Sequence, residues 1–340
     1  MKALRYLGAK TLEVQEVPTP VPGEGEVLLK VRACGICGSD VHGYLGLTGR
    51  RIPPMTMGHE FAAEVAEAGP GAKKFHPGDG VVVQPINFCG ECANCREGLT
   101  NMCLNKKFFG VLTVDGAMAE YVAVPEKLLY KLPQGCSYEV GALTEPYAVA
   151  YGSLVKSGSL KGQTVMIIGA GTIGLCILQL ARLHQPEKII VCDLSENRLR
   201  AALDFGADAV INPKKKDYLA TVERFTGGKM LDTSFEAVGV EATANQSIKS
   251  VKVNGTVIWV GMSQKEMTIN MQDVVCSARE IRGSFNYTHK EFGEVVDLLG
   301  SGKVEAQKLI SKTVPLAQAP DAFAALHENP DDYIKVIIQD

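Results

Sequence analysis

The 340-residue sequence has no long apolar run, no secretory signal and no stripe of basic residues, and each absence narrows the possible functions. No stretch approaches the roughly 20 apolar residues that a membrane-spanning helix needs. The N-terminal segment MKALRYLGAKTLEV alternates like a β-strand and lacks the apolar core and cleavage site of a signal peptide. We therefore expect a cytoplasmic protein without a membrane partner.

The charge of the chain argues against a nucleic-acid-binding protein, and its lack of repeats argues against a repeat or low-complexity protein. The net charge is −3 and the basic residues are dispersed, which argues against nucleic acid as a partner. The 35 glycines and 16 prolines are spread along the chain without low-complexity runs or internal repeats. A hydrophobic content of 46% is typical of a globular protein, and the length predicts two domains.

Two kinds of pattern divide the chain. Residues 1–152 contain short β-type segments broken by Pro and Gly turns, which predicts an all-β barrel or sandwich. Residues 153–284 alternate apolar strands with helices, starting from QTVMIIG, and this βαβ series predicts a doubly wound parallel sheet. Residues 285–340 have a mixed pattern, and periodicity alone does not assign them to either domain.

The strongest chemical motif is CGECANCREGLTNMC, within residues 88–104, which spaces four cysteines as C-x2-C-x2-C-x7-C. In a cytoplasmic protein, clustered cysteines indicate metal ligands rather than disulfides. Four thiolates from one loop can surround a tetrahedral Zn²⁺ and leave no open position, so Cys89, Cys92, Cys95 and Cys103 predict a structural zinc site. An iron–sulfur cluster and four unrelated buried thiols are the alternatives.

A glycine fingerprint, GAGTIG, follows the first buried strand of the βαβ series and opens a helix. In this context the glycines allow a tight turn and a close approach to a dinucleotide pyrophosphate at the helix N-terminus. The candidate cofactor-binding residues of the fingerprint are Gly169, Gly171, Thr172, Ile173 and Gly174.

Asp193 ends the next predicted strand, where a carboxylate accepts hydrogen bonds from the adenosine ribose hydroxyls. This residue favours NAD over NADP, because a carboxylate repels a 2′-phosphate. Arg198 and Arg200 are the nearby basic residues, expected on the following helix, and they leave NADP open as the alternative. Arg198 is kept as a candidate cofactor contact.

Three dispersed residues are of the types that bind catalytic zinc: Cys37 in CGICGSDVHG, His59 in GHE and Glu145 in GALTEPYAVAYG. Glu145 is the one carboxylate of an apolar stretch, so it needs solvent, a proton, a partner or a metal. Pro146 biases it toward an extended backbone. Singly, Cys37 could be a core thiol and His59 a structural histidine, but together with the fingerprint they favour a zinc site.

These motifs, in this order along essentially the whole chain, resemble those of the zinc-dependent medium-chain dehydrogenases of the alcohol and polyol dehydrogenase superfamily. The resemblance implies an α/β protein with a GroES-like, β-rich catalytic domain and a Rossmann domain inserted before its last segment. Residues 285–340 would then return to the catalytic domain. It also implies a homotetramer or homodimer, in which the strand at 255–261 is a candidate for pairing between copies.

The resemblance makes Cys37 and His59 ligands of a catalytic zinc, so that each chain would hold two Zn²⁺ ions. Glu145 stands where classical alcohol dehydrogenases carry a cysteine, whereas the sorbitol, butanediol and galactitol-phosphate branch has Glu-Pro there. In part of that branch this Glu reaches zinc through a water, with the residue at Glu60 as the inner ligand. Glu60 and Glu145 therefore share the third position.

The family pattern also assigns a proton relay. Ser39 matches the hydroxyl that hydrogen-bonds the reacting alcohol, and His42 matches the outer end of a relay through the nicotinamide ribose. Asp40 matches a carboxylate that orients the ligand histidine. The reaction implied is reversible oxidation of a secondary alcohol, such as a polyol, polyol phosphate or vicinal diol, to a ketone with NAD.

The substrate is expected only as a class. Polyol dehydrogenases often have a His shortly after Glu-Pro, where this chain has Tyr151 and Gly152. GSFNYT (283–288) resembles galactitol-phosphate-type enzymes, and Arg50 and Arg51 either hold a phosphate or are solvated loop residues. The alternatives are a dehydrogenase of another small hydroxy compound, threonine-like or a simple alcohol, and a non-catalytic nucleotide-binding relative.

Overall fold

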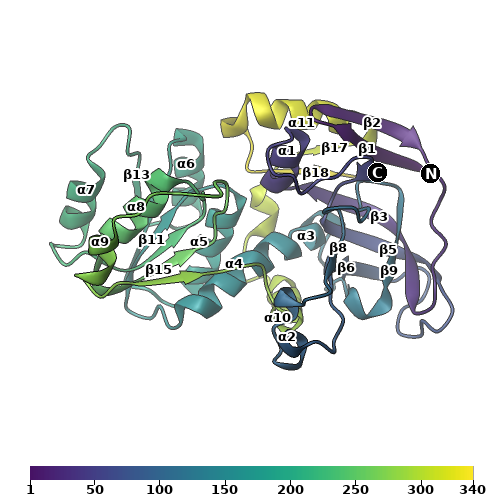
Figure 1. Ribbon diagram of the computed structural model, residues 1–340, viewed down its shortest axis with the longest axis horizontal. Coiled ribbons are helices and arrows are strands. Elements are labelled where there is room, and N and C mark those ends of the chain that lie inside the picture. The colour runs from purple at the N-terminus through teal and green to yellow at the C-terminus, as the bar shows by residue number, and fades with distance from the viewer. Residues whose placement is uncertain (340) are drawn as a thin grey trace. The chain divides into compact units, whose positions relative to one another are not determined.

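Figure 1 shows the computed structural model, which describes residues 1–339. The chain divides into two compact units. The first is made of Met1–Glu145 together with the segment from Thr288 onward, and the second is made of Pro146–Tyr287. The C-terminal segment therefore folds with the N-terminal part of the chain.

The chain leaves the first unit inside helix α4 (Thr144–Ser157). Glu145 lies in the first turn of this helix, so the expectation of an extended backbone at Glu145 is wrong. Pro146 is compatible with a helix here because the first N–H groups of any helix have no intrahelical acceptor.

A mixed sheet built around β3 forms the framework of the first unit (Figure 1). In order, the sheet contains β10 (Leu129–Lys131), β6 (Gly80–Val83), β5 (Glu60–Ala68), β3 (Glu26–Ile36), β18 (Lys335–Ile338) and β17 (Ile310–Val314), with β9 (Tyr121–Pro125) also paired to β3. One edge of β3 pairs with β5, and the other pairs first with β9 and then with β18. The last strand thus lies beside the end of β3, next to Cys37.

Smaller elements surround this sheet and carry the loops that matter for function. Among the described residues they are β1 (Lys2–Gly8), β2 (Thr11–Glu16), α1 (Gly38–Tyr44), β4 (Met55–Thr56), β7 (Ile86–Asn87), α2 (Ala93–Arg96), β8 (Lys107–Phe108), α3 (Tyr138–Ala142), α10 (His289–Gly300) and α11 (Ala319–Glu328), with 3₁₀ helices η1 (Thr100–Met102), η2 (Glu126–Leu128), η3 (Ala306–Leu309), η4 (Leu316–Gln318) and η5 (Pro330–Asp332).

The second unit contains the predicted parallel sheet. Within the described part of the chain its strand order is β13 (Ala209–Ile211), β12 (Lys188–Cys192), β11 (Thr164–Ile168), β14 (Leu231–Glu236), β15 (Val251–Trp259) and β16 (Glu280–Gly283), all parallel. The order reverses between β11 and β14, which is the switch point where doubly wound sheets bind nucleotides. The doubly wound fold predicted from the sequence is confirmed.

Helices complete this unit: α5 (Thr172–Leu183), α6 (Glu196–Asp204), α7 (Tyr218–Phe225), α8 (Glu241–Ser250) and α9 (Met271–Val275). Residues Val165 to Ile168 of β11 are essentially inaccessible to solvent. The apolar run in the sequence predicted this burial, because such a run is typical of a strand covered on both faces. The strand proposed to pair between copies forms β15 and is already flanked by β14 and β16. That proposal is wrong, because both edges of β15 are paired within the chain.

Candidate active site and metal centres

The four cysteines of the CGECANCREGLTNMC motif gather in the loop between β7 and β8. Their sulfurs lie within 4.8 Å of one another, with 3.5 Å between Cys103 and Cys89 and 4.0 Å between Cys89 and Cys95. A tetrahedron with zinc–sulfur bonds of about 2.3 Å has edges of about 3.8 Å. The separations therefore suit one ion held by four thiolates, and they are far too long for disulfides.

The backbone of this loop prepares two of the thiols to bind a cation. Backbone N–H groups of Leu104 and Cys95 lower the pKa of Cys92 to about 6, and those of Glu91 and Cys92 lower the pKa of Cys89. Burial raises the pKa of Cys95 to about 12. A zinc ion would overcome that cost, because coordination replaces the thiol proton.

A second group of metal-type side chains lies where β3 ends and β5 begins. Ligand atoms of Cys37, His59 and Glu60 lie within 4.8 Å of one another. Cys37 caps the N-terminus of α1, and its sulfur accepts a hydrogen bond from the backbone N–H of Ser39 at 3.5 Å. His59 and Glu60 lead into β5, which pairs with β3 so that Glu60 lies opposite Gly35. The sheet register thus brings together residues from two separate motifs.

A buried lysine faces this group from the last strand of the chain. Lys335 Nζ donates to Glu60 Oε2 at 2.6 Å and to the carbonyl of Ile36 at 3.1 Å. Lys335 and Glu60 are only 2% and 1% exposed. Their strands lie on opposite sides of β3, and a Cβ at Gly35 would lie 2.2 Å from Glu60 Oε2, so the glycine leaves room for the pair.

Sequence reasoning missed Lys335, although a single lysine inside the apolar strand YIKVII was the available clue. Burial alone would lower the pKa of Lys335, but the carboxylate of Glu60 and the thiol of Cys37 outweigh burial and raise it. Glu145 also raises the pKa of Lys335, although more weakly. The cation therefore offsets negative charge that several potential ligands concentrate here.

Glu145 is buried but is not part of the Cys37, His59 and Glu60 group. It starts α4, and its charge acts on Lys335. The geometry therefore favours Glu60 over Glu145 as the carboxylate next to Cys37 and His59.

Asp40 lies beside His59 and is also buried. Asp40 Oδ1 lies 3.5 Å from His59 Nδ1, which leaves the opposite ring nitrogen, Nε2, for a metal. Burial alone would raise the pKa of Asp40, but His59 and Arg51 hold it well below its usual range. Burial alone would lower the pKa of His59, but Asp40 raises it well above its ordinary value. A metal binding here would displace that proton.

Arg51 differs from both expectations for it, because it is neither solvated nor free to hold a phosphate. Only 6% of its surface is exposed, and its Nη2 donates to Asp40 Oδ1 at 2.7 Å and to Ser39 Oγ at 3.3 Å. Arg50, by contrast, is exposed. Ser39 and His42 lie one turn apart on α1, and both are partly exposed.

The GAGTIG fingerprint forms the link between β11 and α5. Gly169 has a φ of +97°, a left-handed conformation that favours glycine, and a Cβ there would lie 2.7 Å from Val238. Gly171 caps α5, and a Cβ at this position would meet open space. Thr172 and Ile173 supply the first helical N–H groups, so the space beside Gly171 suits an anionic pyrophosphate.

Close packing fixes the other end of this turn. A Cβ at Gly174 would lie 1.7 Å from the carbonyl oxygen of Gly169. Asp193, directly after β12, accepts from the N–H of Ala170 at 2.6 Å and of Ser195 at 2.8 Å. Each carboxylate oxygen keeps a lone pair for a ribose hydroxyl. Arg198 lies in the first turn of α6, as expected.

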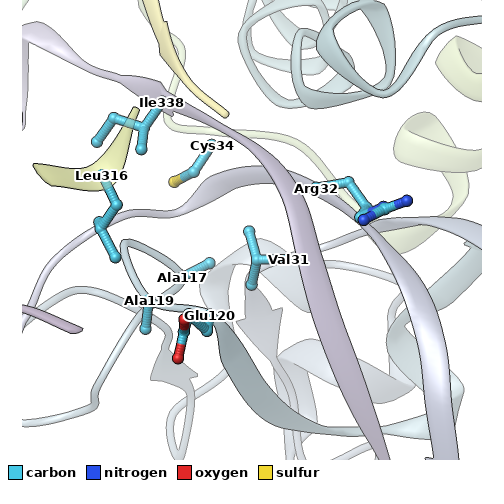
Figure 2. Close-up of a pocket in the computed structure, with 8 residues that line it drawn as sticks. All are labelled: Val31, Arg32, Cys34, Ala117, Ala119, Glu120, Leu316 and Ile338. Atoms are coloured by element: carbon cyan, nitrogen blue, oxygen red, sulfur yellow. The ribbon is translucent and has the colours of Figure 1, made fainter. Parts of the chain in front are cut away.

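A small cavity of about 20 Å³ lies elsewhere in the first unit and is not a substrate site (Figure 2). Val31, Cys34, Leu316 and Ile338 are among its lining residues. Its volume suits about one water molecule. Burial raises the pKa of Cys34 well above its ordinary value, so this thiol is a poor nucleophile.

Within residues 1–339, no helix is long and apolar enough to cross a membrane.

Comparisons with known proteins agree with this arrangement. The family described as "Alcohol dehydrogenase GroES-like domain" matches residues 23–134, and that described as "Zinc-binding dehydrogenase" matches residues 172–301. The sorbitol dehydrogenase of Bacillus subtilis (strain 168) is 32% identical over 342 residues, which cover 99% of this chain and 97% of the relative. The (R,R)-butanediol dehydrogenase of the same strain is 35% identical over 353 residues, which cover 100% and 99%.

A solved structure has the same architecture. The zinc-binding dehydrogenase of Sinorhizobium meliloti 1021 bound to NADP has a TM-score of 0.91 to this chain at 34% identity, and the match covers 100% of this chain and 99% of that one. The resemblance found in the sequence motifs is thus confirmed, as are the GroES-like and Rossmann parts of the fold. The chain belongs to the zinc-dependent medium-chain dehydrogenases, a family of oxidoreductases.

Proposed function

We propose that this protein is a cytoplasmic enzyme that reversibly oxidises a secondary alcohol, in the form of a polyol, polyol phosphate or vicinal diol, to a ketone and passes the hydride to NAD. The observation that carries the proposal is the convergence of ligand atoms of Cys37, His59 and Glu60 within 4.8 Å, with the backbone N–H of Ser39 hydrogen-bonded to the Cys37 sulfur. The likeness to sorbitol and butanediol dehydrogenases supports this substrate class.

Cys37, His59 and a carboxylate form the donor set of a catalytic zinc site, and Glu60 is the nearer carboxylate. A zinc ion there would supply Lewis acidity that lowers the pKa of a substrate hydroxyl. A divalent cation, one thiolate and two carboxylates sum to −1, and Lys335 brings the sum to zero. Lys335 thereby limits the combined negative charge of Glu60 and Glu145, which would otherwise weaken the Lewis acidity of the ion.

The chain's own residues handle the proton. Ser39 follows Cys37 by two residues, and its hydroxyl would accept the proton of the reacting alcohol. His42 lies one turn further along α1 and is partly exposed, so it can pass that proton to solvent. Asp40 keeps His59 in the orientation that leaves Nε2 for the metal.

The second unit supplies the dinucleotide site. The N-terminus of α5, beginning at Thr172, would bind the pyrophosphate, and Asp193 would accept hydrogen bonds from ribose hydroxyls. The dinucleotide supplies the hydride acceptor. Asp193 supports NAD as the preferred form, and Arg198, on the neighbouring helix, is the residue that would favour NADP.

The phosphorylated substrates have less support than the neutral ones. Arg51 is held inside the protein by Asp40, so of the two loop arginines only Arg50 is exposed. We therefore place neutral polyols and vicinal diols first. The family resemblance further supports a homotetramer or homodimer, which light scattering on the purified protein would test.

A screen of polyols, diols and polyol phosphates with NAD and NADP tests the proposal, followed by the absorbance of reduced nicotinamide. The wild-type chain should bind two zinc ions and turn over at least one neutral diol or polyol. Cys37→Ser should lose one zinc and nearly all activity, whereas the exposed Cys276→Ser, a matched control, should lose neither. Full activity of Cys37→Ser without that zinc would contradict the mechanism.

A further inference from the structure

Arg51 is a buried cation that the proposed mechanism does not yet use. It lies between α1 and β4, and its guanidinium is almost completely inaccessible. Burying a charge is costly unless the charge is paired and hydrogen-bonded. Its carboxylate partner is Asp40, which is itself 0% exposed and faces His59. The Arg51–Asp40 pair therefore lies next to His59, the proposed zinc ligand.

A single nitrogen of Arg51 joins two functional groups. Nη2 carries two hydrogens, and it lies 2.7 Å from Asp40 Oδ1 and 3.3 Å from Ser39 Oγ. A serine hydroxyl has one hydrogen and two lone pairs. Because Arg51 occupies one lone pair, the other lone pair and the hydrogen remain, which is what a group needs to receive one proton and release another.

Helix α1, which carries Ser39, packs closely against the aliphatic part of the Arg51 side chain. Gly43 lies on α1 one turn after Ser39, and a Cβ there would lie 2.4 Å from Arg51 Cγ and 3.4 Å from Arg51 Cβ. These atoms are close to the backbone of Arg51, so the side chain could not easily move away. The contact gives a second way to displace the guanidinium without removing its charge.

We propose that Arg51 is a positioning residue, which orients the Ser39 hydroxyl for proton transfer through the hydrogen bond from Nη2 while Asp40 anchors the guanidinium. This inference rests on the proposed alcohol oxidation, in which Ser39 accepts the substrate proton. It assigns Arg51 no contact with substrate and no phosphate-binding role.

A double-mutant cycle between Arg51→Met and Ser39→Ala tests the proposal with a neutral diol as substrate. Ser39→Ala should lower kcat about 100-fold, and Arg51→Met about 10-fold with little change in KM. In the Ser39→Ala background, Arg51→Met should lower kcat less than about twofold, because the partner through which it acts is gone. The solvent deuterium isotope effect on kcat should rise in Arg51→Met, since proton transfer becomes slower.

Arg5 offers a matched control in the same unit. Its Nη1 also bonds one carboxylate and one hydroxyl, Asp115 Oδ1 at 3.0 Å and Thr56 Oγ1 at 2.9 Å. Arg5→Met removes the same kind of interaction away from Ser39, so it should leave kcat and the isotope effect unchanged. Gly43→Ala, which keeps the charge of Arg51, should lower kcat in the same direction as Arg51→Met and should add little to it.

Bound zinc is measured for every variant, and kcat is expressed per occupied site. If Arg51→Met lost zinc but kept kcat per zinc, or if the effects of Arg51→Met and Ser39→Ala multiplied, Arg51 would be structural and the inference would be overturned. An active wild type with such results would leave the proposed function intact. A wild type inactive on every alcohol of the screen would overturn the proposed function and this inference with it.

Discussion

Replacing Lys335 with methionine removes the cation that faces Glu60 in the interior of the first unit. Both side chains are almost fully buried, and their charged atoms lie 2.6 Å apart. In the zinc-free protein, removing one partner of a buried ion pair typically costs about 3–5 kcal/mol, because the other charge is left without compensation. In a unit of this size, each kcal/mol of lost stability lowers the unfolding temperature by about 2–4 °C. The expected fall in the unfolding temperature is therefore roughly 6–20 °C.

Hydrogen exchange and thermal unfolding together measure this effect. Because two units need not unfold in one step, the amides of β3 and β18 report on the unit that contains Lys335, and those of β11 serve as the internal reference. Lys335→Arg keeps the charge and should retain most of the stability. Lys290→Met removes an exposed partner of Glu294, and should cost no more than about 1 kcal/mol.

The reasoning about Lys335 would be refuted by a loss in Lys335→Met no larger than that in Lys290→Met. Unchanged protection of β3 and β18 would lead to the same conclusion. Either result would mean that Glu60 does not need the lysine as a counter-charge.

Three further predictions concern other sites. Cys92→Ser should lower bound zinc by one ion per chain, measured by atomic emission, and a full complement of zinc would rule out the four-cysteine site. Asp193→Ser should raise the ratio of kcat/KM for NADP to that for NAD about 10- to 100-fold, as expected for loss of a charged hydrogen bond; an unchanged ratio would show that Asp193 does not read the ribose. Burial, together with the positive charges of Lys127 and Lys74, lowers the pKa of His289 in the folded protein. The folded state therefore binds a proton at His289 less readily than the unfolded state does. As a result, the protein loses stability as pH falls below the unfolded-state pKa of about 6.5. His289→Gln should flatten the fall in unfolding temperature below about pH 6.5, and an equally steep fall would contradict the assignment.

Features encoded in short stretches of sequence could be predicted, because their geometry is set locally. The four cysteines lie in one loop, and the GAGTIG glycines form one turn, so spacing alone indicates what they can bind. The alternation of strands and helices likewise predicted the parallel sheet of the second unit. In these cases the chain needs no distant partner to bring the groups together.

Features that depend on strand pairing could not be predicted in the same way. Lys335 and Glu60 are 275 residues apart, and only the pairing of β18 and β5 with opposite sides of β3 brings them together. The burial of Arg51 depends on the small residue at Gly43 and on the position of Asp40, neither of which the loop sequence reveals. The helical backbone at Glu145 was missed because a residue before proline is also compatible with the first turn of a helix.

The transfer of deuterium from a labelled alcohol to the nicotinamide tests the central claim most directly. The protein would be incubated with butane-2,3-diol or sorbitol deuterated at the carbinol carbons and with NAD, and the reduced nicotinamide analysed by mass spectrometry. Our account predicts that the reduced cofactor carries one deuterium with the wild-type protein, and that none forms with Cys37→Ser. Reduced nicotinamide without deuterium, or labelled cofactor formed equally by Cys37→Ser, would contradict it.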